Sequence, residues 1–303
     1  MLLNIGMPLD GLEEIRIRIH QPLVIRCGSK EYFIKEDGEA VPESCRNAYK
    51  PMEEDLNRTL ELMSNYSLYA FEEEIKNGYI TIRGGHRVGI CGQAVLAEGA
   101  VKTIKNVNGL NIRMTHQVKG CAGRVIERIA RPALKHTMII SPPGCGKTTL
   151  IRDIARLLSN GDAGKGIPGY NIGIVDERSE IAGCYQGVPQ NDVGVRTDIL
   201  DAAPKAKGMV MLLRSMSPQA IIVDEIGRKE DSDAIDEIVN SGVKVICTVH
   251  GASVADILKK AVLSEILQKD IFELFIVLKY GQSAGEIAGI YEKKDVAERA
   301  VAL

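Results

Sequence analysis

The chain has 303 residues, of which 45% are hydrophobic, and its formal net charge at pH 7 is −2. This length favours two domains, and the hydrophobic content is sufficient for a sizeable core. A nearly neutral chain has no overall basic field that would attract nucleic acid. No apolar run approaches the ~20 residues of a membrane span, and the N-terminus lacks a signal-peptide pattern, so any membrane contact would be peripheral.

The seven cysteines are scattered along the chain, and none belongs to a C-x-x-C pair. A zinc site or a disulfide framework is therefore not expected, and the odd count fits the reducing cytosol. We interpret Cys145, which lies within a glycine-rich loop, as a small packing residue rather than a redox switch.

The first part of the chain, residues 1–118, predicts a small α+β domain. Isoleucines alternate with Arg16 and Arg18, which is typical of a half-buried strand with a basic outer face. A helix is expected from Pro51, because proline at the first helical position is followed here by acidic residues. A second helix is expected over about 68–76. The expected strands cover 15–19, 23–25, 32–34, 79–82, 88–91 and 110–114.

The predicted hairpin of 79–82 and 88–91 turns at R-G-G-H. Its tip has glycines between Arg83 and Arg87, so it could contact an RNA backbone or another phosphate. A basic loop alone is weak support for such contact, and we favour a solvated turn.

The second part, residues 119–303, alternates short apolar runs with helical patterns. The runs cover 137–140, 172–175, 221–223, 243–249 and 275–278, and one of the helical patterns covers 231–240. This alternation predicts an α/β domain with a mainly parallel sheet. Ligands bind such sheets beyond the carboxyl ends of the strands, so polar residues that follow the runs are candidates for function.

The apolar run 137–140 continues into S-P-P-G-C-G-K-T-T and then into a helical pattern that ends at Asn160-Gly161. Strand, glycine-rich loop and helix together indicate a phosphate-binding Walker A loop for ATP. Lys147 would reach the β- and γ-phosphates, and Thr148 would hold Mg²⁺. The pattern has Gly where this chain has Ser141; that position mainly serves the turn, so binding should survive. The expected nucleotide-binding residues are Pro143, Gly144, Cys145, Gly146, Lys147, Thr148 and Thr149.

Residues 221–223 run directly into Asp224 and Glu225, which is the Walker B pattern. Asp224 would hold Mg²⁺, and Glu225 would activate the attacking water. Glu177, after the run 172–175, is the alternative base, and His250 could sense the γ-phosphate. An arginine near that phosphate is also expected, and the candidates are Arg178, Arg196, Arg214 and Arg228. The chain has no N-K-x-D segment, so guanine specificity is not indicated.

Other segments are more specific than these general motifs. They are R-G-G-H-R-V-G-I-C-G, P-P-G-C-G-K-T-T-L, V-D-E-R-S-E-I-A-G, G-V-P-Q-N-D-V-G-V-R-T-D, S-M-S-P-Q-A-I-I-V-D-E-I-G-R-K-E-D and T-V-H-G. Together they resemble the stage III sporulation protein AA family, over about residues 15–291. The resemblance implies a RecA-like P-loop NTPase domain, preceded by a smaller N-terminal domain and related to type II/IV secretion ATPases. Residues 176–178 of this chain would correspond to the acidic "Asp box" of those enzymes, and residues 248–250 to their "His box".

The resemblance also implies a hexameric ring and a place in the cell. The protein would act in the mother cell of an endospore former, in the cytoplasm and peripherally at the membrane around the forespore. Its partners would be other stage III sporulation proteins of a channel-like complex, which it would energise by hydrolysing ATP with Mg²⁺.

Two alternatives remain open from the sequence. One is a nucleic-acid translocase or RNA-binding ATPase that uses Arg16, Arg18 and the tip between Arg83 and Arg87. The other is a scaffold that binds ATP without hydrolysing it, although the presence of Glu225 argues against it. Salt-dependent binding of single strands would test the first alternative, and a turnover assay would test the second.

Overall fold

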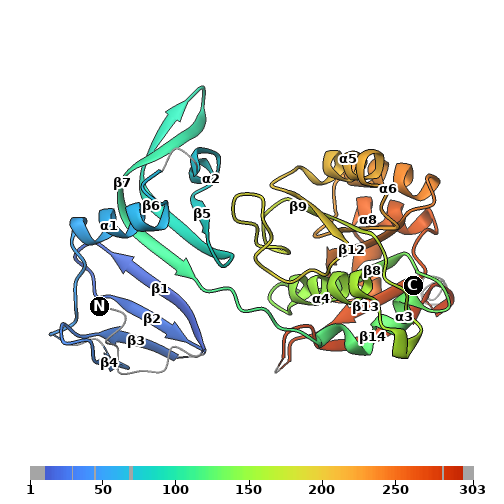
Figure 1. The fold of residues 1–303 in the computed structure, drawn as a ribbon, viewed down its shortest axis with the longest axis horizontal. Coiled ribbons are helices and arrows are strands. Elements are labelled where there is room, and N and C mark those ends of the chain that lie inside the picture. The colour runs from blue at the N-terminus through green and yellow to red at the C-terminus, as the bar shows by residue number, and fades with distance from the viewer. Residues whose placement is uncertain (1–10, 29, 44–45, 68–70, 282, 296–303) are drawn as a thin grey trace. The chain divides into compact units, whose positions relative to one another are not determined.

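A computed structural model of the chain describes residues 11–28, 30–43, 46–67, 71–281 and 283–295. Contacts between Cα atoms divide the chain into two compact units, Met1–His116 and Gln117–Leu303 (Figure 1). Among the described residues, no helix combines the length and the apolar character that crossing a bilayer requires.

The first unit is an antiparallel sheet with the strand order β4-β3-β2-β1-β7-β6-β5 and two helices. The helices α1 and α2 contact β7, and α2 also contacts β5. The elements are β1 (Leu12–Arg18), β2 (Val24–Cys27), β3 (Lys30–Ile34), β4 (Ala40–Val41), α1 (Glu53–Met63), α2 (Glu72–Lys76), β5 (Tyr79–Ile82), β6 (His86–Ala97) and β7 (Ala100–Arg113).

Alternation in β1 follows the sequence pattern. Ile15 and Ile17 are buried, whereas Arg18 is exposed. The register pairs Ile15 with Ile112 and Ile17 with Leu110, so buried residues of neighbouring strands share one face. The opposite face of the same strands carries the arginines, because side chains alternate along a strand.

Two helix predictions for this unit need correction. The first helix begins at Glu53 rather than at Pro51, because Met52 is its N-cap and the Met52 N–H donates to Asp55 Oδ2 at 2.8 Å. The second helix begins at Glu72; part of the predicted range, 68–70, lies outside the described residues.

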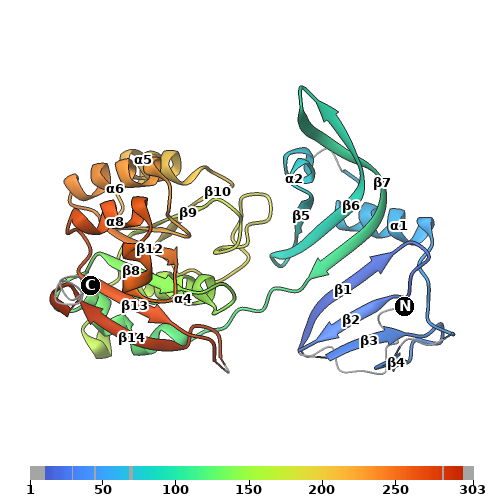
Figure 2. The ribbon, with the colours of Figure 1, turned by 180° about the vertical axis from the view of Figure 1, so that it is seen from behind.

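The strands predicted over 88–91 and 110–114 are parts of one long hairpin, β6 with β7, which the sequence did not predict. It continues to a turn at Glu98 and Gly99, both with positive φ, and Figure 2 shows it rising beyond the neighbouring strands. Its outer part is exposed on both faces, so the apolar alternation that marks a half-buried strand is missing there. The predicted tip is also less solvated than expected, because His86 Nδ1 accepts the Thr115 N–H at 3.1 Å.

The second unit is an α/β structure with the strand order β10-β9-β11-β12-β8-β13-β14, in which β14 alone runs antiparallel to its neighbour. Its strands are β8 (Thr137–Ser141), β9 (Ile172–Asp176), β10 (Thr197–Asp201), β11 (Ala220–Val223), β12 (Lys244–His250), β13 (Leu274–Leu278) and β14 (Ile287–Glu292). Its helices are α3 (Ile126–Ala130), α4 (Lys147–Asn160), α5 (Lys205–Met216), α6 (Lys229–Asn240), α7 (Val254–Leu258) and α8 (Ala261–Gln268).

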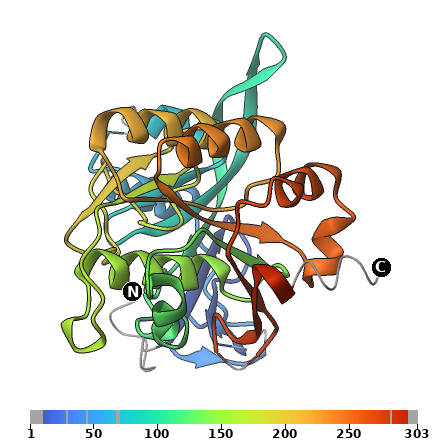
Figure 3. The same cartoon turned by 90° about the vertical axis from the view of Figure 1, so that its right-hand side faces the viewer.

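Both faces of this sheet are covered, which explains why its strands read as continuous apolar runs. Ile139 packs in one cluster with Leu150 and Ile154 of α4. Met138 and Ile140 pack in the other cluster with α5, α6, α7 and α8. Figure 1 shows α4 on one side of the sheet and α5 and α6 on the other, and Figure 3 shows α5 and α6 lying side by side.

The parallel pairing gathers the predicted functional residues at one edge. Strand β11 lies between β9 and β12, and β12 also pairs with β8. The carboxyl ends of these strands are therefore neighbours, which places Asp176, Asp224 and His250 along the same edge as the loop after Ser141.

Candidate functional site

The loop between β8 and α4 has the backbone of an anion cradle. Gly144 and Gly146 have φ values of 76° and 83°, which residues other than glycine rarely adopt. A Cβ on Gly146 would also lie 2.5 Å from the nitrogen of Gly285. The Ser141 hydroxyl donates to the Pro142 carbonyl at 2.7 Å, so the residue that replaces Gly keeps its polar group within the turn.

Three cationic or hydrogen-bonding groups converge on the carboxylate of Glu225. The ammonium of Lys147 contacts Glu225 Oε1. His250 Nε2 lies 3.0 Å from Oε1, and Arg178 Nη1 lies 3.3 Å from Oε2. The side chain of Lys147 is only 11% exposed, so the lysine is directed into the site and is not a solvent-facing loop residue.

These contacts set the protonation state of Glu225. Burial raises the pKa of the carboxyl, but Lys147, His250 and Arg178 outweigh burial and hold the pKa below its usual value. Glu225 is therefore ionised at neutral pH, as a base that accepts a proton from water must be.

The backbone of Glu225 is held in an unusual conformation. Its φ is 55°, in the left-handed region that costs free energy for a residue with a side chain. The Glu225 N–H donates to Thr248 Oγ1 at 2.8 Å, and Lys205 Nζ donates to the Glu225 carbonyl at 2.7 Å. These two hydrogen bonds secure the turn that aims the carboxylate toward Lys147.

Thr148 and Asp224 provide adjacent oxygens that suit Mg²⁺. The Thr148 hydroxyl donates to Asp224 Oδ2 at 2.9 Å, and the buried Thr248 hydroxyl donates to Asp224 Oδ1. Mg²⁺ in nucleotide sites takes one or two protein oxygens together with phosphate oxygens and water. The Thr148 hydroxyl in the first turn of α4 and the Asp224 carboxylate directly after β11 fit that donor set.

The two acids at the end of β9, Asp176 and Glu177, have different surroundings from Glu225. Asp176 is 2% exposed and accepts the N–H groups of Glu180 and Ala182 at 2.9 and 2.8 Å. Burial, opposed by these hydrogen bonds, raises the pKa of Asp176 to about 6. Glu177 instead pairs with Lys205 at 3.3 Å. Asp176 therefore organises the loop after β9, and Glu177 shares a lysine with the backbone of Glu225.

The four candidate arginines lie in different places. Arg178 is at the Glu225 carboxylate, whereas Arg228 is exposed at the N-cap of α6. Arg214 pairs with Glu237 at 2.9 Å on the outer surface of α5 and α6. Arg196 Nη1 donates to the Ser159 carbonyl at 2.8 Å. Ser159 is near the far end of α4, which is about 20 Å long, so Arg196 does not reach the Lys147 end in its own subunit.

Sequence patterns did not identify Lys205 or the role of Thr248. Lys205 begins α5 and is distant in sequence from both glutamates, and a single lysine at a helix start resembles ordinary surface charge. Its side chain is only 11% exposed and lines the hollow formed by Asp176, Glu177, Arg178, Glu180, Asp224 and Glu225. Thr248 lies in a predicted strand end, but nothing in the sequence indicates that it hydrogen-bonds Asp224 and Glu225.

If the site hydrolyses ATP, as the sequence predicts, replacing Lys205 by alanine is expected to lower turnover about ten- to hundredfold, because a hydrogen bond from a charged group contributes about 1.5–3 kcal/mol. Since Lys205 positions Glu225 rather than the nucleotide, kcat should fall while nucleotide affinity changes little. The matched control is Lys207→Ala, an exposed lysine of the same helix. Equal losses in both variants, or a loss confined to affinity, would contradict a positioning role.

Comparison with known proteins identifies clear relatives. A sequence model described as "Sporulation stage III, protein AA" matches residues 1–297. The Stage III sporulation protein AA of Bacillus subtilis strain 168 is 43% identical over 283 residues, which cover 93% of this chain and 87% of that protein.

Solved structures share the fold at low identity. The pilus retraction motor PilT with bound ADP has a TM-score of 0.64 at 15% identity, covering 99% of this chain and 85% of that chain. The ATPase DotB of Legionella pneumophila has a TM-score of 0.57 at 17% identity, covering 88% and 72%. The expected α/β class is thus confirmed, with an architecture similar to those of PilT and DotB.

Proposed function

The chain belongs to the sporulation stage III protein AA family, and we propose that it is a Mg²⁺-dependent ATPase that drives a membrane-associated sporulation complex. The observation that carries this proposal is the convergence of Lys147, Arg178 and His250 on Glu225, beside the Thr148–Asp224 pair. The fold shared with PilT and DotB, whose descriptions name a bound ADP and an ATPase, supports it.

Each residue of the site has a role in this proposal. The N–H groups of residues 144–149 cradle the phosphates of ATP, and Lys147 neutralises the β- and γ-phosphates. Thr148 and Asp224 would hold Mg²⁺, which would supply positive charge to the transferred phosphoryl group. Glu225 accepts a proton from the attacking water, and His250 donates a hydrogen bond near the γ-phosphate.

The Lys147–Glu225 pair suggests how binding prepares the base. Lys147 contacts the Glu225 carboxylate, and in this proposal it exchanges that anion for the phosphates when ATP binds. Glu225 then loses its closest cation, which makes its carboxylate a better proton acceptor. Lys205 and Thr248 keep the Glu225 backbone in place during this exchange.

The wider biological role rests on the family. We infer that the protein acts at the membrane around the forespore, on its mother-cell side, together with other stage III sporulation proteins. A ring of several copies, with six as the expected number, would place an arginine of one copy near the ATP of the next. Arg196, which is remote from its own Lys147, is the candidate for this role, with Arg178, Arg214 and Arg228 as alternatives.

Mass measurement with and without ATP tests assembly, and mixing two inactive variants tests the arginine. If Arg196 acts across a subunit boundary, Lys147→Ala mixed with Arg196→Ala forms some interfaces that have both residues, and part of the activity returns. Lys147→Ala mixed with Glu225→Gln is the control, since both residues belong to one site and no complete site forms. A protein that stays monomeric during full steady-state turnover would contradict the ring.

A scaffold that binds ATP without hydrolysing it is the second candidate. The constellation around Glu225 disfavours it, because a scaffold has no need of an ionised carboxylate held in a strained backbone conformation. Turnover by the purified protein separates the two functions.

A further inference from the structure

The face of the N-terminal sheet opposite its buried isoleucines presents a regular array of side chains. The register aligns three rows across the adjacent strands β6, β7 and β1. The rows are Arg87–Arg113–Glu14, Gly89–Asn111–Arg16 and Cys91–Gly109–Arg18. Four arginines and one glutamate therefore share a face on which two positions have no side chain.

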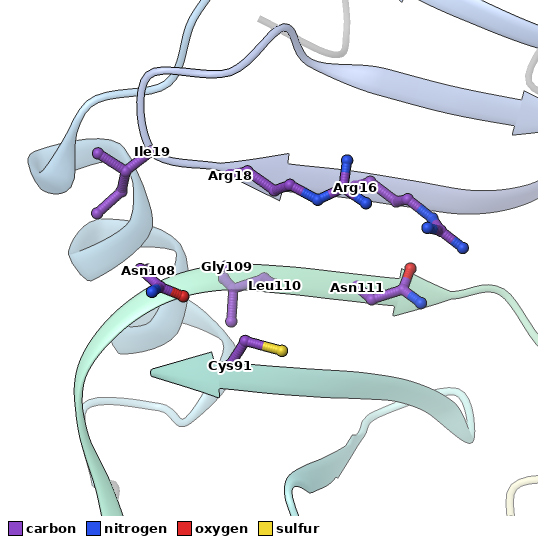
Figure 4. Close-up of a pocket in the computed structure, with 8 residues that line it drawn as sticks. All are labelled: Arg16, Arg18, Ile19, Cys91, Asn108, Gly109, Leu110 and Asn111. Carbon is purple, nitrogen blue, oxygen red and sulfur yellow. The ribbon is translucent and has the colours of Figure 1, made fainter. Parts of the chain in front are cut away.

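This face contains a hollow of about 460 Å³ lined by Arg16, Arg18, Ile19, Cys91, Asn108, Gly109, Leu110 and Asn111. Figure 4 shows Arg16 and Arg18 along β1 and Asn111 on the neighbouring strand β7. Gly109 leaves the floor open, since a Cβ there would meet only ordinary contacts, 3.6 Å from the Ile17 carbonyl and 3.7 Å from Cys91 Cβ.

The charges in the hollow are only partly balanced. Arg16 pairs with the buried Glu14 at 3.0 Å. Burial of Glu14 opposes ionisation, but hydrogen bonds from Arg16 and Asn111 hold the pKa of that carboxyl below its usual value. Arg18 is exposed and forms no ion pair with the described part of the chain.

A second observation concerns Asn111. Its Oδ1 is buried and has no hydrogen-bond partner in the described ranges, while the Asn111 side chain hydrogen-bonds Glu14. A buried acceptor without a donor is unfavourable. If Arg16 turned from Glu14 toward a ligand anion, a hydroxyl or amino group of that ligand would satisfy this oxygen.

A flat stacking surface lies on the same face. Tyr79 is opposite Gly89 in the register, and the Arg87 guanidinium lies 3.6 Å from the centre of the Tyr79 ring. Arginine planes and aromatic rings are the groups on which unpaired bases stack. Arg16 and Arg18, two residues apart, are spaced at about 7 Å along β1, which suits successive anions better than a single small ion.

We propose that this face, the 3×3 array of β6, β7 and β1, binds single-stranded nucleic acid. The arginines would contact successive phosphates, the glycine floor would admit sugars or bases, and the Arg87–Tyr79 pair would stack a base. A membrane surface is a poorer ligand for this face, because lipid headgroups would have to enter the hollow to reach Arg16 and Arg18. The proposal does not depend on the ATPase function.

Fluorescence anisotropy with a labelled oligothymidylate longer than ~16 nucleotides tests this proposal at low salt. The full chain should bind, and Arg18→Glu should weaken binding about tenfold or more, with a salt slope lower by about 0.7 for the lost phosphate contact. The matched control is Arg58→Glu, an exposed arginine of α1 with the same charge change, which should weaken binding much less than Arg18→Glu because it lies outside the array.

Two further arms separate the alternatives. Gly109→Val, checked for folding by thermal unfolding, should weaken binding by filling the floor, and Lys147→Ala should bind the oligonucleotide like wild type. Loss of binding in Lys147→Ala would place the strand in the ATP loop and overturn the proposal. So would equal effects of Arg18→Glu and Arg58→Glu, no binding by wild type, or Arg18-dependent binding of phosphatidylglycerol vesicles without binding of the oligonucleotide.

Discussion

Replacing Lys147 by alanine is expected to lower ATP turnover by about 10²–10³-fold, the cost of removing one preorganised donor from a charged transition state. Nucleotide affinity should also fall, because the cation that neutralises the β- and γ-phosphates is lost. Steady-state phosphate release measures the first effect, and titration with a fluorescent ATP analogue measures the second.

The fold should survive this change. Without Lys147, the Glu225 carboxylate keeps Arg178 and His250 as partners, so no buried charge is left alone. The control is Lys259→Ala, an exposed lysine of the same unit, which should behave as wild type. Wild-type turnover in folded Lys147→Ala would refute the assignment of the phosphate loop.

Replacing Glu225 by glutamine is expected to separate binding from hydrolysis. The variant keeps the size of the side chain but cannot accept a proton, so ATP should still bind while turnover falls about 10²–10⁴-fold. The affinity for ATP should be retained, because in this variant Lys147 does not have to leave the Glu225 carboxylate to reach the phosphates. The comparison needs both phosphate release and nucleotide titration on the same preparation.

Glu177→Gln and Glu230→Gln are the controls for this result. Glu177 pairs with Lys205, which also holds the Glu225 carbonyl, so its loss should have a smaller effect on turnover. Glu230 is exposed on α6, and its replacement should have none. If Glu177→Gln stops hydrolysis while Glu225→Gln does not, the two glutamates must exchange roles.

The pH dependence follows from the contacts of Glu225. Lys147, His250 and Arg178 hold its pKa below the usual value in the free protein. A base with a lowered pKa is active above that pKa and is lost as pH falls through it. The acid limb of kcat/KM that belongs to Glu225 is therefore expected below about pH 4.3, the ordinary glutamate value.

Sequence patterns predicted the second unit well because its strands are buried on both faces. Runs such as 138–140 and 221–223 are apolar throughout, so they can be recognised from the sequence without knowing their neighbours in the sheet. Strand β10 was missed because its five residues are all half-buried and include two aspartates. The long hairpin was missed for the opposite reason, since exposure on both faces removes any alternation.

The site was only partly predictable for a geometric reason. Lys147 and Glu225 belong to motifs that are local in sequence, and parallel pairing of β8, β12 and β11 brings them together. Lys205 belongs to no motif, and only the position of α5 over the sheet places its ammonium beside Glu225. The same reasoning separates the arginines, because sequence spacing could not show that Arg178 reaches Glu225 and Arg196 does not.

The most direct measurement for the central claim is release of inorganic phosphate from ATP by the purified full chain, with Mg²⁺ and with excess chelator. The account predicts Mg²⁺-dependent turnover that is strongly reduced in Lys147→Ala and in Glu225→Gln, with both variants folded. Folded wild-type protein that binds ATP but releases no more phosphate than Glu225→Gln, as a monomer and at ring-forming concentration, would contradict it.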